Sequence, residues 1–403
     1  MSTFGQILRQ HRKERGLSLR ELGGLTTFGF TFLSQVERGE RKASERLARR
    51  CDDALEARGG LIEAFREEQT SDSNMYRRTV LRTMGALAAS PLPLVQWEAL
   101  RQGMAAAVDS DLDQWDQVIS DYGVDYYRLP ADHIMSNLRA DLTVLQPHIA
   151  VATGAERDRL LRAASRLSVI VALNMAAAGN ALAASRWWRD AHKYAEDSRD
   201  PDSIVFARAW EVVNGCYNGR APSRVVARAD DVLALVDGQP SAASCGLLAG
   251  RAQALSLAGR HAEAISTVHQ LTDLAGQLPA IVINDVDSLW GWPEHRVRHT
   301  EAWVYGHAGN LNEAARAQEQ AVSLYPSRMA RLRTQVRLHH AGALIRNGHI
   351  SDGLRLAADL LEELPTEQHN GPLRAVVQQV IEAVPLEERR RPTFKELTDR
   401  ATA

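Results

Sequence analysis

The residues whose side chains could do recognition chemistry crowd into one short stretch near the start of the chain. Gln35 carries an amide that can form two hydrogen bonds with the edge of an adenine, whereas the hydroxyls of Thr31 and Ser34 discriminate less. Phe30 can contact a thymine methyl group. Groups better suited to phosphate oxygens surround this set: Ser18, Arg20, Arg38, Arg41 and Lys42.

Two short helices joined by a tight turn would hold these side chains. Ser18 and Glu21 have the spacing of a capping box, which predicts a helix that begins at Leu19. Gly29 can serve as the N-cap of a second helix over Phe30–Val36. This arrangement is a helix-turn-helix, in which the second helix enters a major groove of DNA. Further helices are expected over Thr3–Arg15, after a Ser44 cap and over Leu61–Glu67, which gives a five-helix domain over residues 1–68.

The stretch from Phe4 to about Leu55 resembles the Cro/cI-type (XRE) DNA-binding domain, through the segments ILRQHRKERGLSLRELG, FLSQVERGERKAS and RLARRCDDAL. The resemblance implies that an arginine of the first helix pairs with the glutamate before the R-G step. The matching positions here are Arg9 and Glu37. Family members usually carry Ser or Thr as the recognition-helix cap. This chain has Gly29 followed by Phe30, so the family's base-reading rule does not transfer.

Charge is distributed unevenly along the 403 residues. Residues 1–50 hold eleven Arg or Lys against five Asp or Glu, and the remainder holds 37 against 45, which together give the net charge of -2. A basic head on an acidic body is expected when a DNA-binding module is joined to a domain that does not bind DNA. Three widely spaced cysteines indicate neither a disulfide framework nor a zinc site, and they are compatible with a reducing cytoplasm.

From Trp97 onward the sequence is helical almost throughout, and it repeats. Glycines followed by similar segments recur with spacings of 40, 40, 50 and 39 residues, at Gly179, Gly219, Gly259, Gly309 and Gly348. A period near 40, with each glycine between two amphipathic helices, predicts an α-solenoid. The copy at Arg298–Pro326 resembles a tetratricopeptide repeat (TPR). The fold class is therefore all-α, with a helix-turn-helix domain followed by a TPR-like α-solenoid over residues 97–403.

Residues 69–96 would form a linker and a helix that docks on the second domain. The polar segment QTSDSNMY is followed by a double arginine and an apolar run that Arg82 and Pro91 interrupt. This run is too short and too broken for a membrane span, and it is too far from the N-terminus for an export signal.

An effector site is predicted near the 50-residue spacing, where about ten extra residues fall within Ala280–Arg298. Aromatic side chains beside arginine could line a pocket in which arginine binds a carboxylate or a phosphate. The alternative is that Trp290 and Trp292 only plug the solenoid core. Two asparagines at equal positions in adjacent repeats could hold an extended peptide. The candidate residues are Asn174, Asn214, Trp290, Trp292, Glu294, Arg296, His299, Trp303 and His307.

The usual catalytic and phosphate-binding motifs do not occur, including G-x-x-x-x-G-K-[ST], G-x-G-x-x-G, H-E-x-x-H and G-x-S-x-G. The thirteen histidines are scattered. We therefore expect no catalytic residues, no metal site and no cofactor.

The architecture resembles that of peptide-responsive bacterial regulators of the RRNPP group and of actinobacterial regulators. It implies a cytoplasmic transcriptional regulator that binds a palindromic operator in double-stranded DNA as a homodimer. Its repeat domain would dimerise and sense a peptide or small-molecule effector. The alternative is a protein-interaction scaffold or adaptor, in which the head merely tethers the chain to DNA.

Overall fold

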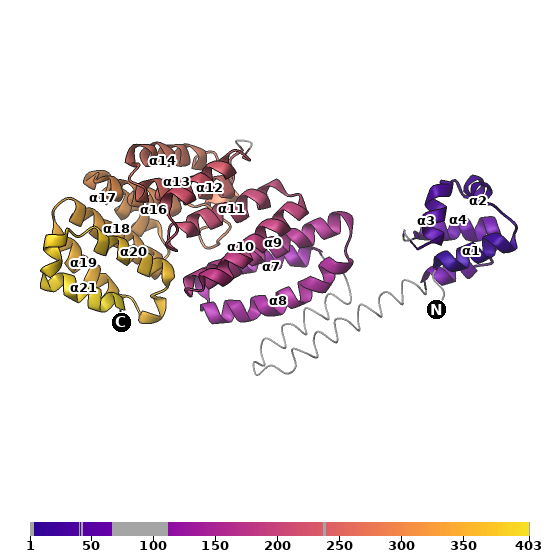
Figure 1. Cartoon of the computed structure of the whole chain (residues 1–403), viewed down its shortest axis with the longest axis horizontal. Coiled ribbons are helices and arrows are strands. Elements are labelled where there is room, and N and C mark those ends of the chain that lie inside the picture. Colours follow the sequence, from indigo (N-terminus) through magenta and orange to yellow (C-terminus); the bar gives the residue numbers. More distant parts are fainter. Residues whose placement is uncertain (1–3, 40, 42, 67–111, 237–238, 403) are drawn as a thin grey trace. The chain divides into compact units, whose positions relative to one another are not determined.

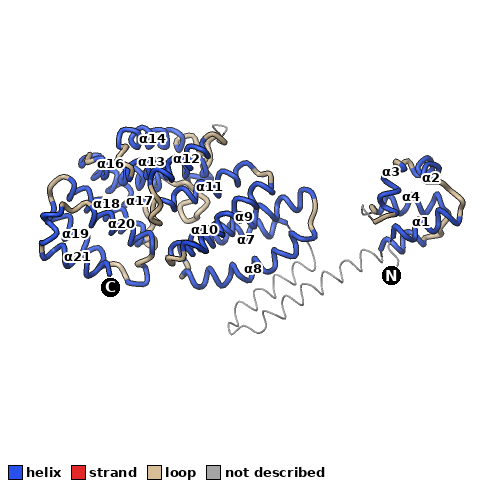
Figure 2. Tube along the Cα trace, viewed as in Figure 1, coloured by secondary structure: helices blue, strands red, loops and turns tan. Residues whose placement is uncertain are grey.

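A computed structural model of the chain describes residues 4–39, 41, 43–66, 112–236 and 239–402. Within these ranges every regular element is a helix (Figures 1 and 2). The chain divides into two compact units, Met1–Gln96 and Trp97–Ala403, which we call the head and the repeat unit. The predicted linker and docking helix at residues 69–96 lie outside the described residues.

The described part of the head contains five helices. The first four are α1 (Phe4–Glu14), α2 (Leu19–Thr26), α3 (Phe30–Glu37) and α4 (Glu45–Leu55), and residues 60–66 form the fifth. The predicted helix-turn-helix is confirmed, with α2 and α3 as its two helices. Apolar side chains from all five helices meet in one core, which includes Phe4, Leu8, Leu22, Leu33, Val36, Leu47 and Leu61.

Local capping explains where these helices begin. The Ser18 hydroxyl accepts a hydrogen bond from the Glu21 N–H (3.3 Å), and the Glu21 carboxylate accepts one from the Ser18 N–H (2.8 Å), so the predicted capping box is present. Ser44 caps α4 through the Leu47 N–H. Gly29 precedes α3 without a side-chain cap, as its lack of a side chain requires.

The predicted ion pair between Arg9 and Glu37 is wrong, because the partner of Glu37 is Arg12. The Arg12 guanidinium donates two hydrogen bonds to the Glu37 carboxylate, at 2.6 and 2.7 Å, and a third to the Leu17 carbonyl. Arg9 is exposed. Arg9 and Arg12 lie one helical turn apart on α1, and the position at which α3 crosses α1 selects the second.

Gly5 sets that crossing. A Cβ atom at this position would lie 2.1 Å from the carbonyl oxygen of Val36 on α3, so only glycine permits the observed approach. Of the two glycines inside α2, Gly23 faces the turn at Phe28, whereas Gly24 faces open space.

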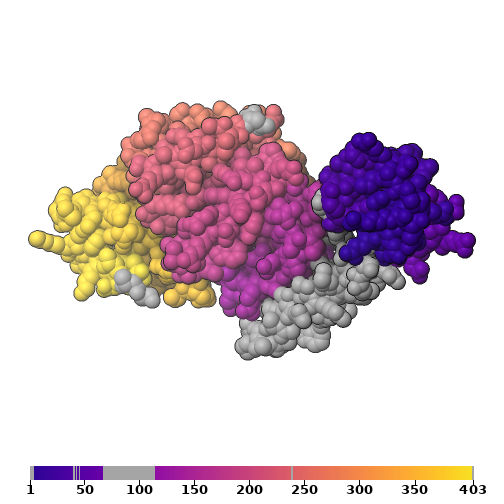
Figure 3. Space-filling model, turned by 45° about the vertical axis from the view of Figure 1, so that its right-hand side comes forward, coloured from indigo at the N-terminus to yellow at the C-terminus, as the bar shows by residue number. Residues whose placement is uncertain are grey.

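The repeat unit is a succession of antiparallel helix pairs. Its helices are α7 (Leu112–Arg128), α8 (Ala131–Val151), α9 (Gly154–Ala177), α10 (Ala181–Ser198), α11 (Pro201–Gly215), α12 (Pro222–Leu233), α13 (Ala242–Leu257), α14 (His261–Ala275), α15 (Ala280–Ile283), α16 (Glu294–Ala308), α17 (Leu311–Leu324), α18 (Ala330–Arg346), α19 (Ile350–Glu363), α20 (Gly371–Glu382) and α21 (Pro392–Thr402). In the space-filling view, the colours of the repeat unit pass in chain order from magenta to yellow, as a stack of pairs requires (Figure 3).

The five repeat glycines occupy the predicted turns. Gly179, Gly219, Gly259, Gly309 and Gly348 all have positive φ angles, between 74° and 87°, and each lies between the two helices of a pair. The left-handed backbone conformation is open to glycine at little cost. The α-solenoid predicted from their spacing is confirmed.

The first helices of six pairs contact one another in series and form an inner layer, which comprises α9, α11, α13, α16, α18 and α20. The series closes, because α20 also contacts α9. At this closure Gly371 lies against the end of α9, where a Cβ atom would be 2.9 Å from the carbonyl oxygen of Ala177. We call this closed arrangement the inner ring.

The ten-residue excess forms α15 and the loop at residues 284–293, and this loop packs on α7. The indole of Trp290 donates to the Ile119 carbonyl (2.7 Å), and the Leu289 N–H donates to the Gly123 carbonyl (2.8 Å). A Cβ atom on Gly123 would overlap the Trp290 indole. The loop therefore joins the inner ring to a helix far away in sequence.

One helix of the repeat unit, α9, is long and apolar enough to cross a membrane. However, 72% of its most apolar window is buried inside the unit. Burial by neighbouring helices accounts for the apolar composition of α9.

Candidate nucleic-acid interface and central cavity

The recognition helix α3 presents the predicted base-reading residues. Phe30 is 49% exposed, Thr31 is exposed, and Ser34 and Gln35 are half-buried. The opposite face of α3, with Leu33 and Val36, is in the core. The Gln35 side-chain amide has no hydrogen-bond partner within the described part of the head, so it can bond to a base edge.

The predicted phosphate-binding residues flank this face, and some contact the base-reading residues directly. Arg20 of α2 lies over the Phe30 ring, 5.4 Å from its centroid, and Arg38 donates to the Ser34 hydroxyl at 3.0 Å. Arg41 lies over Phe32, a contact that the sequence did not suggest. These contacts hold flexible cationic side chains beside α3. Ser18 is exposed and belongs to the capping box, and Lys42 lies outside the described residues.

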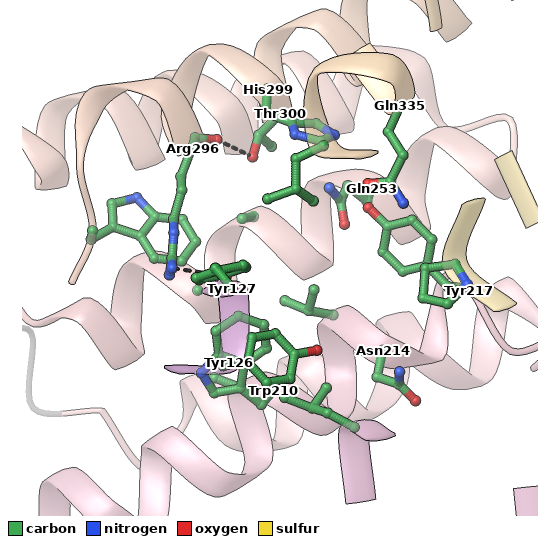
Figure 4. A pocket seen from close by; sticks show the side chains of 18 of the residues that line it. Tyr126, Tyr127, Trp210, Asn214, Tyr217, Gln253, Arg296, His299, Thr300 and Gln335 are labelled. Atoms are coloured by element: carbon green, nitrogen blue, oxygen red, sulfur yellow. Dashed lines mark hydrogen bonds between the residues drawn. The ribbon is translucent and has the colours of Figure 1, made fainter. Parts of the chain in front are cut away.

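A cavity of about 150 Å³ lies within the inner ring of the repeat unit. Each of the six inner-ring helices contributes to its lining, and α7 adds two tyrosines. Figure 4 shows His299 and Thr300 at the top, Tyr126 and Trp210 at the bottom, and the Arg296 side chain extending down toward Tyr127. Gln253, Tyr217 and Gln335 line the remaining side (Figure 4).

Four of the nine predicted effector residues line this cavity: Asn214, Trp292, Arg296 and His299. The two tryptophans have different surroundings. Trp292 is 6% exposed and faces the cavity, whereas Trp290 packs between the loop and α7. Asn214 accepts a hydrogen bond from Asn218 (3.1 Å).

The other predicted effector residues lie elsewhere. Asn174 is buried and donates to the carbonyl of Ile170 on its own helix (2.9 Å). Glu294 is exposed and pairs with Arg298. Trp303 is fully buried, and His307 stacks on it with ring centroids 5.3 Å apart.

Four histidines lie in the cavity wall or close to it: His295, His299 and His339 are buried, and His307 is half-buried. Burial lowers the pKa of His299 to about 4, of His295 to about 3 and of His307 to about 3, and it lowers the pKa of His339 well below its ordinary value. Nearby Arg296 and Arg346 contribute to these shifts. These imidazoles are therefore neutral at pH 7. No cluster with the composition of a metal site occurs among the described residues.

Several cavity residues were absent from the sequence prediction. Tyr126 and Tyr127 come from α7, and Gln253 and Gln335 come from α13 and α18. Gln253 lies in the mainly apolar sequence of α13, which is a weak sequence signal, whereas Gln335 lies in a polar stretch of α18 and gives none. No local signal existed for the tyrosines.

Comparison with known proteins identifies the head. Residues 3–65 match a family model described as a helix-turn-helix domain. Among solved structures, the chain is similar to Bacillus thuringiensis PlcR in complex with the peptide PapR7 and DNA. The identity is 11%, the alignment covers 92% of this chain and 97% of that chain, and the TM-score is 0.32. The search of curated proteins gives no match.

The family match covers the five head helices, whose geometry is that of the predicted helix-turn-helix. Residues 3–65 therefore form a helix-turn-helix domain.

Proposed function

We propose that this chain is a transcriptional regulator that acts in the cytoplasm by binding a two-fold operator as a homodimer, and that an effector in the central cavity changes its affinity for DNA. One small head buries too little surface for strong specificity, which favours a dimer. The repeat unit would supply both the dimer contact and the effector site.

The observation that supports an effector site is the position of the cavity inside the inner ring. A ligand there contacts all six inner helices at once, so it can favour one arrangement of those helices over another. An effector shifts affinity for DNA only if it binds one arrangement more tightly than the other. A cavity at the meeting point of six helices suits that requirement better than a surface groove on one repeat.

Gel-shift titrations of the full-length protein, with and without fractions of cell extract, test the proposal. We expect one fraction to change the operator affinity. Filling the cavity by Ala249→Leu should abolish that response while DNA binding persists, because the buried Ala249 lines the cavity and lies in the other unit from α3. Intact DNA binding without a response to any fraction would indicate a constitutive regulator. Recovery of a stoichiometric protein partner without promoter DNA would favour the scaffold alternative.

Base reading by α3 has its own test. Gln35→Ala should weaken binding to the cognate operator by roughly 1–3 kcal/mol and leave binding to random DNA unchanged, because an adenine contact acts on one sequence only. The matched control is Gln10→Ala on α1, where the exposed glutamine bonds only to Glu14. Equal weakening by Gln35→Ala on random and cognate DNA would reassign Gln35 to backbone contact.

A further inference from the structure

The cavity in the inner ring has positive charge without a matching negative charge. Arg296 and Arg331 both line it, and no Asp or Glu occurs among its described lining residues. Neither arginine has a carboxylate within ion-pair distance in the described part of the chain. His299 does not add charge at pH 7, because burial lowers its pKa to about 4. A partly buried cation without a counterion is unfavourable, so an anion is the complementary ligand.

Arg296 is already oriented for such a ligand. Its guanidinium donates to the carbonyls of Leu289 (3.2 Å) and Ser288 (2.9 Å) and to the Tyr127 hydroxyl (3.1 Å). The rings of Tyr127, Trp210 and Trp292 lie 5.5–5.9 Å from it. All three hydrogen-bond acceptors are neutral, so the guanidinium is immobilised but its charge is not balanced. Little rotamer entropy would be lost when this arginine binds an anion.

Four polar atoms on the cavity-lining side chains lack partners. They are buried without a hydrogen bond in the described structure: the Gln253 side-chain oxygen, Trp292 Nε1, His299 Nε2 and Arg331 Nε. Buried polar groups are normally paired, and a ligand or an ordered water supplies the missing bond where the protein does not. These groups indicate a ligand with polar atoms rather than a purely apolar one.

The size of the cavity and the side chains of its wall restrict the class of ligand further. Aromatic side chains form much of the wall: Tyr126, Tyr127, Trp210, Tyr217, Trp292 and Tyr325. The volume of about 150 Å³ is that of a cavity that holds one benzene molecule, about 150 Å³. A peptide of several residues exceeds it.

We propose that the central cavity binds a small monocyclic carboxylate, with the ring between the aromatic walls and the carboxylate bonded to Arg296 and Arg331. This inference rests on the proposed effector function, for which it names the ligand class.

Isothermal titration of the full-length protein tests the assignment, with benzoate as the probe and benzamide as its neutral counterpart of the same shape. Benzoate should bind saturably, and benzamide should bind at least about tenfold more weakly, because it lacks the charge that strengthens hydrogen bonds to arginine. Arg331→Gln should weaken benzoate binding to a similar extent. The matched control is Arg337→Gln on the same helix, which removes a surface ion pair with Glu363 and should leave binding unchanged. Arg331→Gln must melt like wild type, so that the loss is not one of folding.

Equal binding of benzoate and benzamide, or no saturable binding of benzoate, would overturn the assignment. If a short peptide instead bound and altered the affinity for DNA, the effector function would stand and the ligand class would fail. If benzoate bound as expected but neither it nor any extract fraction changed the gel shift, the ligand class would stand and the effector function would fail.

Discussion

Each unit of the chain packs an arginine between helices, and the two arginines differ in the charge of their hydrogen-bond partners. In the head, Arg12 meets a carboxylate through two short hydrogen bonds, and the side chains of Arg12 and Glu37 are only 11% and 5% exposed. In the repeat unit, Arg296 has three neutral acceptors and aromatic neighbours. The first charge is balanced by the protein, where it links α1 to α3. The second is positioned but not balanced, which is the property of a binding site. Hydrogen bonding alone therefore does not distinguish structural from ligand-binding arginines, whereas charge balance does.

The largest expected difference between the units is their response to acid. Burial lowers the pKa of seven described histidines of the repeat unit, namely the four described above together with His148, His192 and His340. The head has only His11, whose side chain is 33% exposed. Unfolding lets each buried histidine bind a proton near its ordinary pKa of 6.5. The neutral histidines therefore cost the repeat unit no stability above that pH. Below it, the free energy of unfolding falls as pH drops toward about 4. Each histidine contributes roughly 1.4 kcal/mol per pH unit in that window.

Tryptophan fluorescence measures this response selectively, because all eight tryptophans lie at or after Trp97. The melting temperature followed by fluorescence should drop steeply between about pH 7 and about pH 5. His339→Gln should make that dependence shallower, and His133→Gln on the exposed surface of α8 should not. A pH-independent transition would mean that the four histidines do not have depressed pKa values in the folded protein.

Removing the carboxylate of the Arg12–Glu37 ion pair should have the next largest effect, which is on the stability of the head. Glu37→Gln leaves Arg12 buried without a counterion, which should destabilise the head by roughly 3–5 kcal/mol. Glu56→Gln removes a second ion pair, Arg15–Glu56, whose side chains are 44% and 73% exposed. Its cost should be much smaller, because solvent screens this exposed pair. Hydrogen exchange of peptides from α1 and α3 reports both variants, and similar protection in the two would contradict the structural role of the buried pair.

A smaller effect on the stability of the head is expected from substitutions at the contact between α1 and α3. Gly5→Ala places a Cβ against the Val36 carbonyl and should cost roughly 1–3 kcal/mol, because the two helices must separate. Gly24→Ala meets nothing within 4 Å. It lies inside α2 and should stabilise the head by about 0.5–1 kcal/mol. Chemical denaturation should thus move in opposite directions for the two variants. Destabilisation by both would show that helix propensity, not the close crossing, governs these positions.

Much of the fold was predictable because its determinants are local. The capping box at Ser18 lies within four residues, and the repeat glycines mark turns through their own backbone conformation. The partner of Glu37 was not predictable, since Arg9 and Arg12 share one side of α1 and only tertiary packing selects between them. For the cavity, the ten extra residues near Arg296 indicated the part of the sequence that supplies some of the lining residues. Tyr127 lies 169 positions away from Arg296, and no periodicity links the two.

The closure of the inner ring changes how the repeat unit should evolve and unfold. An open solenoid is a chain of nearest neighbours, so its ends fray and repeats can be gained or lost. Here the contact of Gly371 with the end of α9 gives the last inner helix a second neighbour. Deleting one helix pair would leave a gap that the remaining pairs could not close without bending. The number of repeats is thereby fixed, and α20 should exchange its amide protons as slowly as a central helix such as α13.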